Sequence, residues 1–154
     1  MNLVRVLAVV ASFLPQLVSA ALLVAPAAGG EFNLSPYVTV LEDPEGSFSV
    51  DQVATDFADR FQPVETENPS FGFSSSVYWL RFTVDTSPAP EREWYVVQRH
   101  PIVDNVSLFS TQRGGGFSER AMGDSLPFDR RELNLREFVW LLDGAAAPKT
   151  YYLR

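Results

Sequence analysis

The stretch of sequence that decides the fold is Val77-Tyr78-Trp79-Leu80-Arg81-Phe82-Thr83-Val84. Aromatic and β-branched residues dominate it, which is typical of a β-strand. Successive side chains of a strand point to opposite faces, so one face would carry Tyr78, Leu80, Phe82 and Val84, and the other Trp79, Arg81 and Thr83. The first face is apolar and is expected to pack in the core. An indole beside a guanidinium can hold a planar or anionic group, so the second face is a candidate binding surface.

The rest of the chain also favours β structure. Further strands are expected at 37–41, 94–98, 105–110, 117–122, 137–142 and 150–154, and a hairpin tip at 112–116. Short strands separated by turn formers about every ten residues predict an antiparallel β-sandwich. One short helix is predicted at 50–60, because Ser49 and Gln52 have the spacing of a capping box and apolar residues follow at helical spacing.

The first 20 residues have the pattern of a secretory signal peptide. Arg5 supplies the positive charge, an apolar run over 6–18 follows, and Val18-Ser19-Ala20 is typical of cleavage before Ala21. Cleavage near 25–28 and a retained N-terminal membrane anchor are the alternatives. After the signal peptide we expect a lead-in over 21–36 and one domain over 37–154, truncated in its last strand.

Composition excludes several classes of function. The 154-residue chain has no cysteine, which excludes thiol catalysis and cysteine-metal sites and, in an exported protein, fits the bacterial periplasm. The net charge is −7, and residues 31–67 hold nine acidic residues against one arginine. This acidity argues against a nucleic-acid partner. We interpret it as a solubility feature.

Catalysis is not indicated by the residues present. His100 is the only histidine, so a triad or a histidine metal site lacks partners. The glycines at 114–116 lack the lysine and hydroxyl residue of a phosphate loop. Carboxylate pairs such as Asp124 and Asp129 exist, but sequence alone does not set their separation. We therefore predict no catalytic residue, no cofactor and no metal.

A ligand-binding function fits better. Sugar sites combine aromatic rings with carboxylates, amides and arginines on a rigid sheet or its loops. The candidate ligand-binding residues are Trp79, Arg81, Arg130, Arg131 and Arg136, with Trp94 as a further candidate. Each candidate also has a structural interpretation. Trp94, like Trp140, lies in a strongly apolar strand and favours the core. Arg81 can form an ion pair with Asp104 or Asp129, and Arg130 and Arg131 can be solvated or form local ion pairs.

Several blocks of sequence, in order, resemble a known family. They are Leu41-Glu42-Asp43-Pro44, Phe71-Gly72-Phe73 with the strand at 77–82, Trp94-Tyr95-Val96-Val97, the segment 102–109, Gly123-Asp124-Ser125-Leu126-Pro127-Phe128-Asp129-Arg130-Arg131, and Thr150-Tyr151-Tyr152-Leu153-Arg154. Their order and spacing are similar to the 7TMR-DISM extracellular domain 2, from about Leu41 to Arg154. That domain is the periplasmic sensory part of bacterial receptors with seven transmembrane helices and diverse intracellular signalling modules.

The resemblance implies a jelly-roll β-sandwich like that of carbohydrate-binding modules. It also implies a position between a signal peptide and a seven-helix membrane region that leads to a cytoplasmic signalling module, such as a diguanylate cyclase or histidine kinase. We therefore expect a periplasmic sensory domain for a small ligand such as a carbohydrate, membrane-associated when part of a receptor. The alternatives are a free-standing carbohydrate-binding module and a structural interaction domain without a small ligand.

Overall fold

The computed structural model describes residues 21–64, 66, 69–72, 74–100 and 102–154, so the predicted signal peptide lies outside the described residues. The described chain is mostly β, which confirms the predicted all-β class. The main sheet has the order β3 (Gln62–Pro63), β2 (Thr39–Asp43), β4 (Val77–Asp85), β9 (Lys149–Leu153), β6 (Val106–Thr111) and β7 (Phe117–Met122), with β1 (Leu22–Val24) also paired to β4. The small sheet pairs β5 (Tyr95–Gln98) with β8 (Phe138–Leu141). The helices are η1 (Ser35–Tyr37), α1 (Val50–Ala54) and η2 (Phe128–Arg130).

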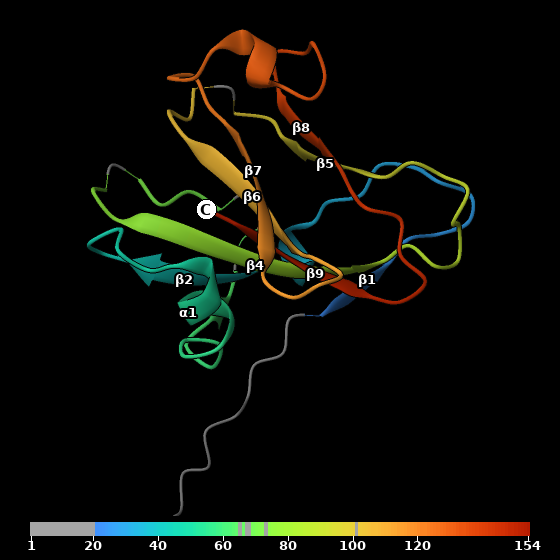
Figure 1. Cartoon of the computed structure of the whole chain (residues 1–154), viewed down its shortest axis with the longest axis horizontal. Helices are drawn as coiled ribbons and strands as arrows, with labels where there is room; N and C mark the ends of the chain where they lie inside the picture. Colours follow the sequence, from blue (N-terminus) through green and yellow to red (C-terminus); the bar gives the residue numbers. More distant parts are fainter. Residues whose placement is uncertain (1–20, 65, 67–68, 73, 101) are drawn as a thin grey trace, which may run out of the picture.

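The main sheet is covered on both faces, as Figure 1 shows, with the small sheet above it and α1 below. On the upper side, Phe82 and Tyr151 of the main sheet form a core with Phe138 and Trp140 of the small sheet. On the lower side, Trp79 and Tyr152 form a second core with residues that include Val53 of α1. The fold therefore has three layers and two apolar interiors.

Strand β4 runs through the middle of this arrangement. Antiparallel neighbours flank it, because Leu80 pairs with Val40 of β2 on one side and with Leu153 of β9 on the other. Trp79 and Phe82, which point to opposite faces, are each only 1% exposed. The face that carries Trp79 and Arg81 is thus a second interior.

Helix α1 begins as predicted and ends earlier. The capping box is confirmed: the Gln52 amide donates to the Ser49 hydroxyl (3.3 Å), and the Ser49 amide to the Gln52 side chain (3.0 Å). The helix was expected to reach residue 60 but ends at Ala54. The Thr55 hydroxyl donates to the Asp51 carbonyl (2.8 Å) and to the Asp56 carboxylate (3.0 Å). Such local side-chain bonds compete with helical ones, which explains the early end.

The segment 21–36, which we expected to be a lead-in, contributes to the main sheet. Strand β1 pairs in parallel with β4, Leu22 lying beside Thr83 and Val24 beside Asp85. The next residue, Ala25, is 2% exposed and its amide donates to the Asp85 carbonyl (2.8 Å). The folded unit therefore already includes Leu22. The strand expected at 37–41 lies two residues later, because Ser35–Tyr37 form a 3-10 turn that includes Pro36.

The C-terminal half follows the expected pattern closely. Strands β6 and β7 form the predicted hairpin around Gln112–Gly116, in which the Gln112 amide bonds to the Gly116 carbonyl (3.1 Å). In β8, Phe138, Val139 and Trp140 are buried while Leu141 is partly exposed. None of the described residues belongs to a helix with the length and hydrophobicity needed to span a bilayer.

Gly123, just after β7, generates a test of the fold. A Cβ added there would overlap the backbone of Asp104 and Asn105, whereas one added to Gly114 in the hairpin tip would meet no atom within 4 Å. We expect Gly123→Ala to lower the free energy of unfolding by about 3 kcal/mol, because backbone cannot move aside cheaply. Gly114→Ala is the matched control and should change it by less than about 0.5 kcal/mol. Urea unfolding of both variants measures this, and equal effects would contradict the predicted clash.

Candidate ligand-binding site

Polar side chains replace apolar ones at one end of the space between the two sheets. On β6 and β7, Leu108 and Met122 face the small sheet and are fully buried. Towards the hairpin tip, the same face carries Ser110, Ser118 and Arg120, because Leu108 pairs with Arg120 and Ser110 with Ser118. Ser110 is 2% exposed. The interior therefore changes from an apolar core to a set of hydrogen-bonding groups.

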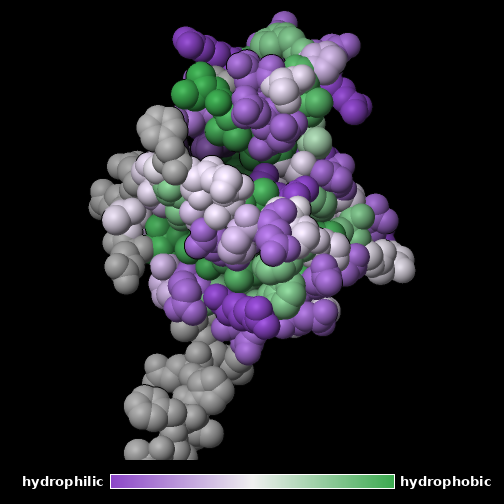
Figure 2. Space-filling view, turned by 90° about the vertical axis from the view of Figure 1, so that its left-hand side faces the viewer, coloured by the Kyte–Doolittle hydropathy of each residue, from purple (hydrophilic) through white to green (hydrophobic). Residues whose placement is uncertain are grey.

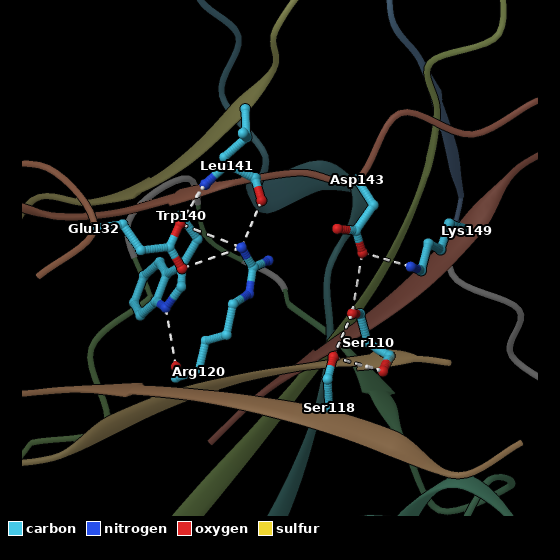
Figure 3. A network of polar contacts seen from close by, with 8 residues as sticks. All are labelled: Ser110, Ser118, Arg120, Glu132, Trp140, Leu141, Asp143 and Lys149. Atoms are coloured by element: carbon cyan, nitrogen blue, oxygen red, sulfur yellow. Dashed lines mark hydrogen bonds and ion pairs between the residues drawn. The ribbon is translucent and has the colours of Figure 1, made fainter. Parts of the chain in front are cut away.

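Arg120 connects the main sheet to the free edge of β8 (Figure 3). Its Nη1 donates to both oxygens of Glu132 (3.1 and 3.2 Å) and to the Leu141 carbonyl (2.7 Å). Glu132 in turn accepts from the Leu141 amide (3.0 Å), so the ion pair satisfies both backbone groups of that residue. The Trp140 indole also donates to the Arg120 carbonyl (3.0 Å). These bonds hold β8 to β7.

Asp143 forms the second half of the same polar cluster. Its Oδ2 accepts from Lys149 Nζ (2.6 Å) and from the Ser110 hydroxyl (3.2 Å), and Ser110 lies 3.0 Å from the Ser118 hydroxyl. The hydrogen bond from Lys149 lowers the pKa of Asp143, the charges of Lys149 and Arg120 add to this effect, and partial burial opposes it. Burial and the Asp143 charge raise the pKa of Tyr151 to about 12.

We define the polar cluster as Ser110, Ser118, Arg120, Glu132, Asp143 and Lys149. Within the described part of the chain, Arg120 Nη2 is a buried donor without a hydrogen-bond partner. Both hydrogen bonds that the Asp143 carboxylate accepts, from Ser110 and Lys149, are to Oδ2, and this side chain is 52% exposed. In Figure 3 the Arg120 guanidinium and the Asp143 carboxylate point towards one another, and the charge of Arg120 contributes to the lowered pKa of Asp143.

The charges of the polar cluster balance. Arg120 and Lys149 contribute two positive charges, and Glu132 and Asp143 two negative ones, so an added ion would gain little from the cluster as a whole. A hydroxyl group both donates and accepts hydrogen bonds. A donor at Arg120 and an acceptor at Asp143 together therefore suit a neutral ligand with hydroxyl groups.

The structure places Trp79 and Arg81 away from this cluster, in the lower core. The ring of Trp79 packs against Phe109 with centroids 5.4 Å apart. Arg81 donates to the Ala58 carbonyl (2.8 Å) and lies 4.2 Å above the Phe61 ring. Burial lowers the pKa of Arg81, with a charge interaction with Tyr152 opposing the change. Neither acid proposed as a partner of Arg81, Asp104 or Asp129, forms an ion pair with it among the described residues.

The other predicted arginines lie in the connection between β7 and β8, which forms the upper part of Figure 2. Arg131 donates to the Leu135 carbonyl (2.9 Å) and to the Arg136 carbonyl, and its guanidinium lies above the rings of Phe128 and Phe138. It holds this connection on β8. The side chains of Arg130 and Arg136 are exposed on the same connection. Half-buried Trp94 packs beside Phe32 (6.2 Å between centroids).

The sequence analysis missed Arg120, Glu132, Asp143 and Lys149. One signal was available: in the strand expected at 117–122, Ser118, Arg120 and Met122 alternate with Phe117, Glu119 and Ala121. Alternation cannot tell which of two mixed faces is buried. Asp143 and Lys149 gave no signal, because they are six positions apart on either side of a loop and meet only when β8 and β9 are in place.

Comparison with known families gives a match over most of the chain. The family model described as 7TMR-DISM extracellular 2 matches residues 35–154, which include the whole polar cluster. No curated protein and no solved structure matches the chain. Among the described residues, no group of three or more histidine, cysteine, aspartate or glutamate side chains is placed to hold a metal ion.

The contacts of Arg81 predict that Arg81→Ala destabilises the fold more than it weakens ligand binding. We expect a loss of about 2 kcal/mol in the free energy of unfolding, because the change removes a hydrogen bond to Ala58 and the cover over Phe61. Arg130→Ala is the exposed control and should have little effect. An unchanged urea midpoint for Arg81→Ala would contradict the prediction.

The lowered pKa of Asp143 predicts a pH-dependent stability. Its carboxylate is stabilised in the folded state, so this contribution is present above the unfolded pKa of about 3.9 and is lost as the pH falls through the lower folded pKa. We expect Asp143→Asn to melt a few degrees below the native chain at pH 7, with a difference that shrinks below pH ~4. Melting curves between pH 7 and pH 2 measure it. A constant difference would show that the charge of Asp143 contributes nothing.

Proposed function

The chain belongs to the 7TMR-DISM extracellular 2 family, and from this premise we propose that it binds a neutral, hydroxyl-bearing small ligand, of which carbohydrates are the main class. Members of this family are extracellular sensor domains of receptors, and they are associated with a seven-transmembrane region. The ligand and its site are the proposed part. The observation that carries the proposal is the free donor of Arg120 facing the carboxylate of Asp143 in a charge-balanced cluster.

The position of the polar cluster supports a sensing role. Arg120 and Lys149 belong to the main sheet, whereas Asp143 lies two residues after the end of β8 of the small sheet. A ligand that accepts from Arg120 and donates to Asp143 would therefore link the two sheets and limit their relative motion. Such a ligand favours one arrangement of the sheets over others, and the membrane region responds to that shift in population.

Three further proposals follow from the family. The domain is a jelly-roll sandwich similar to carbohydrate-binding modules, which the two facing sheets support. It lies in the periplasm after export by a signal peptide, and its parent receptor carries a cytoplasmic signalling module. The contacts of β1 support cleavage before Ala21, because cleavage near 25–28 would remove a paired strand.

Binding can be tested by thermal shift of the purified chain with neutral mono- and oligosaccharides. We expect at least one compound to raise the melting temperature. Asp143→Ala should weaken its binding about tenfold or more, because the ligand loses a charged hydrogen-bond partner. Asp129→Ala, which removes an exposed acid on the β7–β8 connection, is the matched control. Failure of every sugar to bind, or equal losses in both variants, would overturn the proposed site.

The cleavage site is tested by the mass of the exported chain. We expect the mature protein to begin at Ala21, so that Leu22 to Ala25 remain paired with β4. Intact-mass measurement of protein from the periplasm of an expressing bacterium decides this. A mature chain that begins after Ala25 would show that β1 is dispensable and that the predicted site is wrong.

A further inference from the structure

A stacked pair of aromatic rings beside a carboxylate lies at the other end of β4 from the polar cluster. We propose that Phe71, Tyr78 and Glu42, called here the aromatic clasp, bind an organic cation with a guanidinium or ammonium head. The clasp and the polar cluster share no residue. Lys149 of the cluster pairs with Val84 near the end of β4, whereas Tyr78 lies at its start. This inference therefore goes beyond the proposed sugar site.

The backbone brings the three side chains together. Glu42 of β2 pairs directly with Tyr78 of β4, so both side chains lie on the same face of the main sheet. Phe71, from the preceding loop, stacks on Tyr78 with ring centroids 4.1 Å apart and an angle of 11° between the rings. Phe71 remains 37% exposed. A flat aromatic surface is thus presented to solvent beside an acidic group.

The carboxylate of Glu42 is oriented and still has free capacity. Its Oε1 accepts from the Ser76 hydroxyl (2.7 Å) and from the Tyr78 hydroxyl (3.4 Å). No described residue donates a hydrogen bond to Oε2, and the residue is exposed. A carboxylate has room for about four hydrogen bonds, and both of these bonds are on one oxygen. The other oxygen is available to an incoming donor.

The local charge favours a cation over a neutral or anionic ligand. The segment 31–67 that supplies Glu42 holds nine acidic residues and one arginine. The nearby Arg154 donates to the Gly46 carbonyl (2.9 Å) and lies over the Trp79 ring, on the opposite face of the sheet from Tyr78. It does not pair with Glu42 in the described structure. The negative charge of Glu42 is therefore not neutralised on its own face.

The combination of an aromatic face and a carboxylate matches the chemistry of a guanidinium or ammonium group. The face of an aromatic ring carries negative charge density and attracts cations, and a guanidinium can stack on a ring while it donates to a carboxylate. If Phe71 only anchored its loop on Tyr78, that role would not require the oriented carboxylate of Glu42 beside it. The clasp supplies both contacts at once.

The experiment is an NMR titration of the native chain with agmatine, a small guanidinium compound, at low salt. N-butylurea is the ligand control, because it has a neutral urea in place of the guanidinium and carries no ammonium group. We expect agmatine to bind in the millimolar range, about fivefold more tightly than the control. Backbone signals of Glu42 and Ser76 should shift. Equal binding of both compounds, or no shift at these residues, would overturn the proposal.

Three variants locate the site. Glu42→Gln and Phe71→Leu should each weaken agmatine binding about fivefold, the first by removing the charge and the second by removing the ring face. Glu45→Gln removes an equal charge from the adjacent turn and should change binding less than twofold. Phe71→Leu keeps an apolar contact on Tyr78, so it tests the clasp even if Glu42→Gln unfolds. Equal losses in Glu42→Gln and Glu45→Gln, or full binding by Phe71→Leu, would show only a diffuse attraction to the acidic surface.

Discussion

Burial of both faces of β4 is the constraint on which the rest of the structure depends. A strand with Trp79 on one face and Phe82 on the other cannot leave either face in water without exposing a large aromatic side chain. One face therefore requires the small sheet and the other requires α1 with the chain that follows it. Arg81 is tolerated in the second interior because backbone and ring contacts at Ala58 and Phe61 replace its water.

The same constraint explains where polar chemistry can occur. Among the described residues the small sheet has two strands, and it covers part of the main sheet. At one end of this cover, Arg120 and Glu132 bind the free edge of β8, and Asp143 and Lys149 lie beside them. At the other end of β4, Glu42, Tyr78 and Phe71 meet at the surface. The two groups of side chains differ in charge, and so in the ligands that suit them.

The role of arginine in this domain is mostly structural. Arg81 and Arg131 both place their guanidinium groups over phenylalanine rings and donate to backbone carbonyls. Arg120 also bonds to backbone, and its Nη2, like Nε of Arg131, has no hydrogen-bond partner among the described residues. Arg120 joins the two sheets and retains a free donor. A hydrogen bond from this donor to a ligand would therefore change the contact between the sheets.

The sequence by itself determined the class of fold, the hairpin from β6 to β7, the capping box at Ser49 and the family, because these depend on local alternation, turn residues and the order of blocks along the chain. It indicated that the two faces of β4 differ, since alternation shows such a difference but not which layers cover each face. Only the tertiary structure decided that Trp79 is buried, that Arg120 meets Leu141, and that Asp143 meets Lys149. These contacts join segments that become neighbours only when two sheets pack together, and no local pattern records that packing.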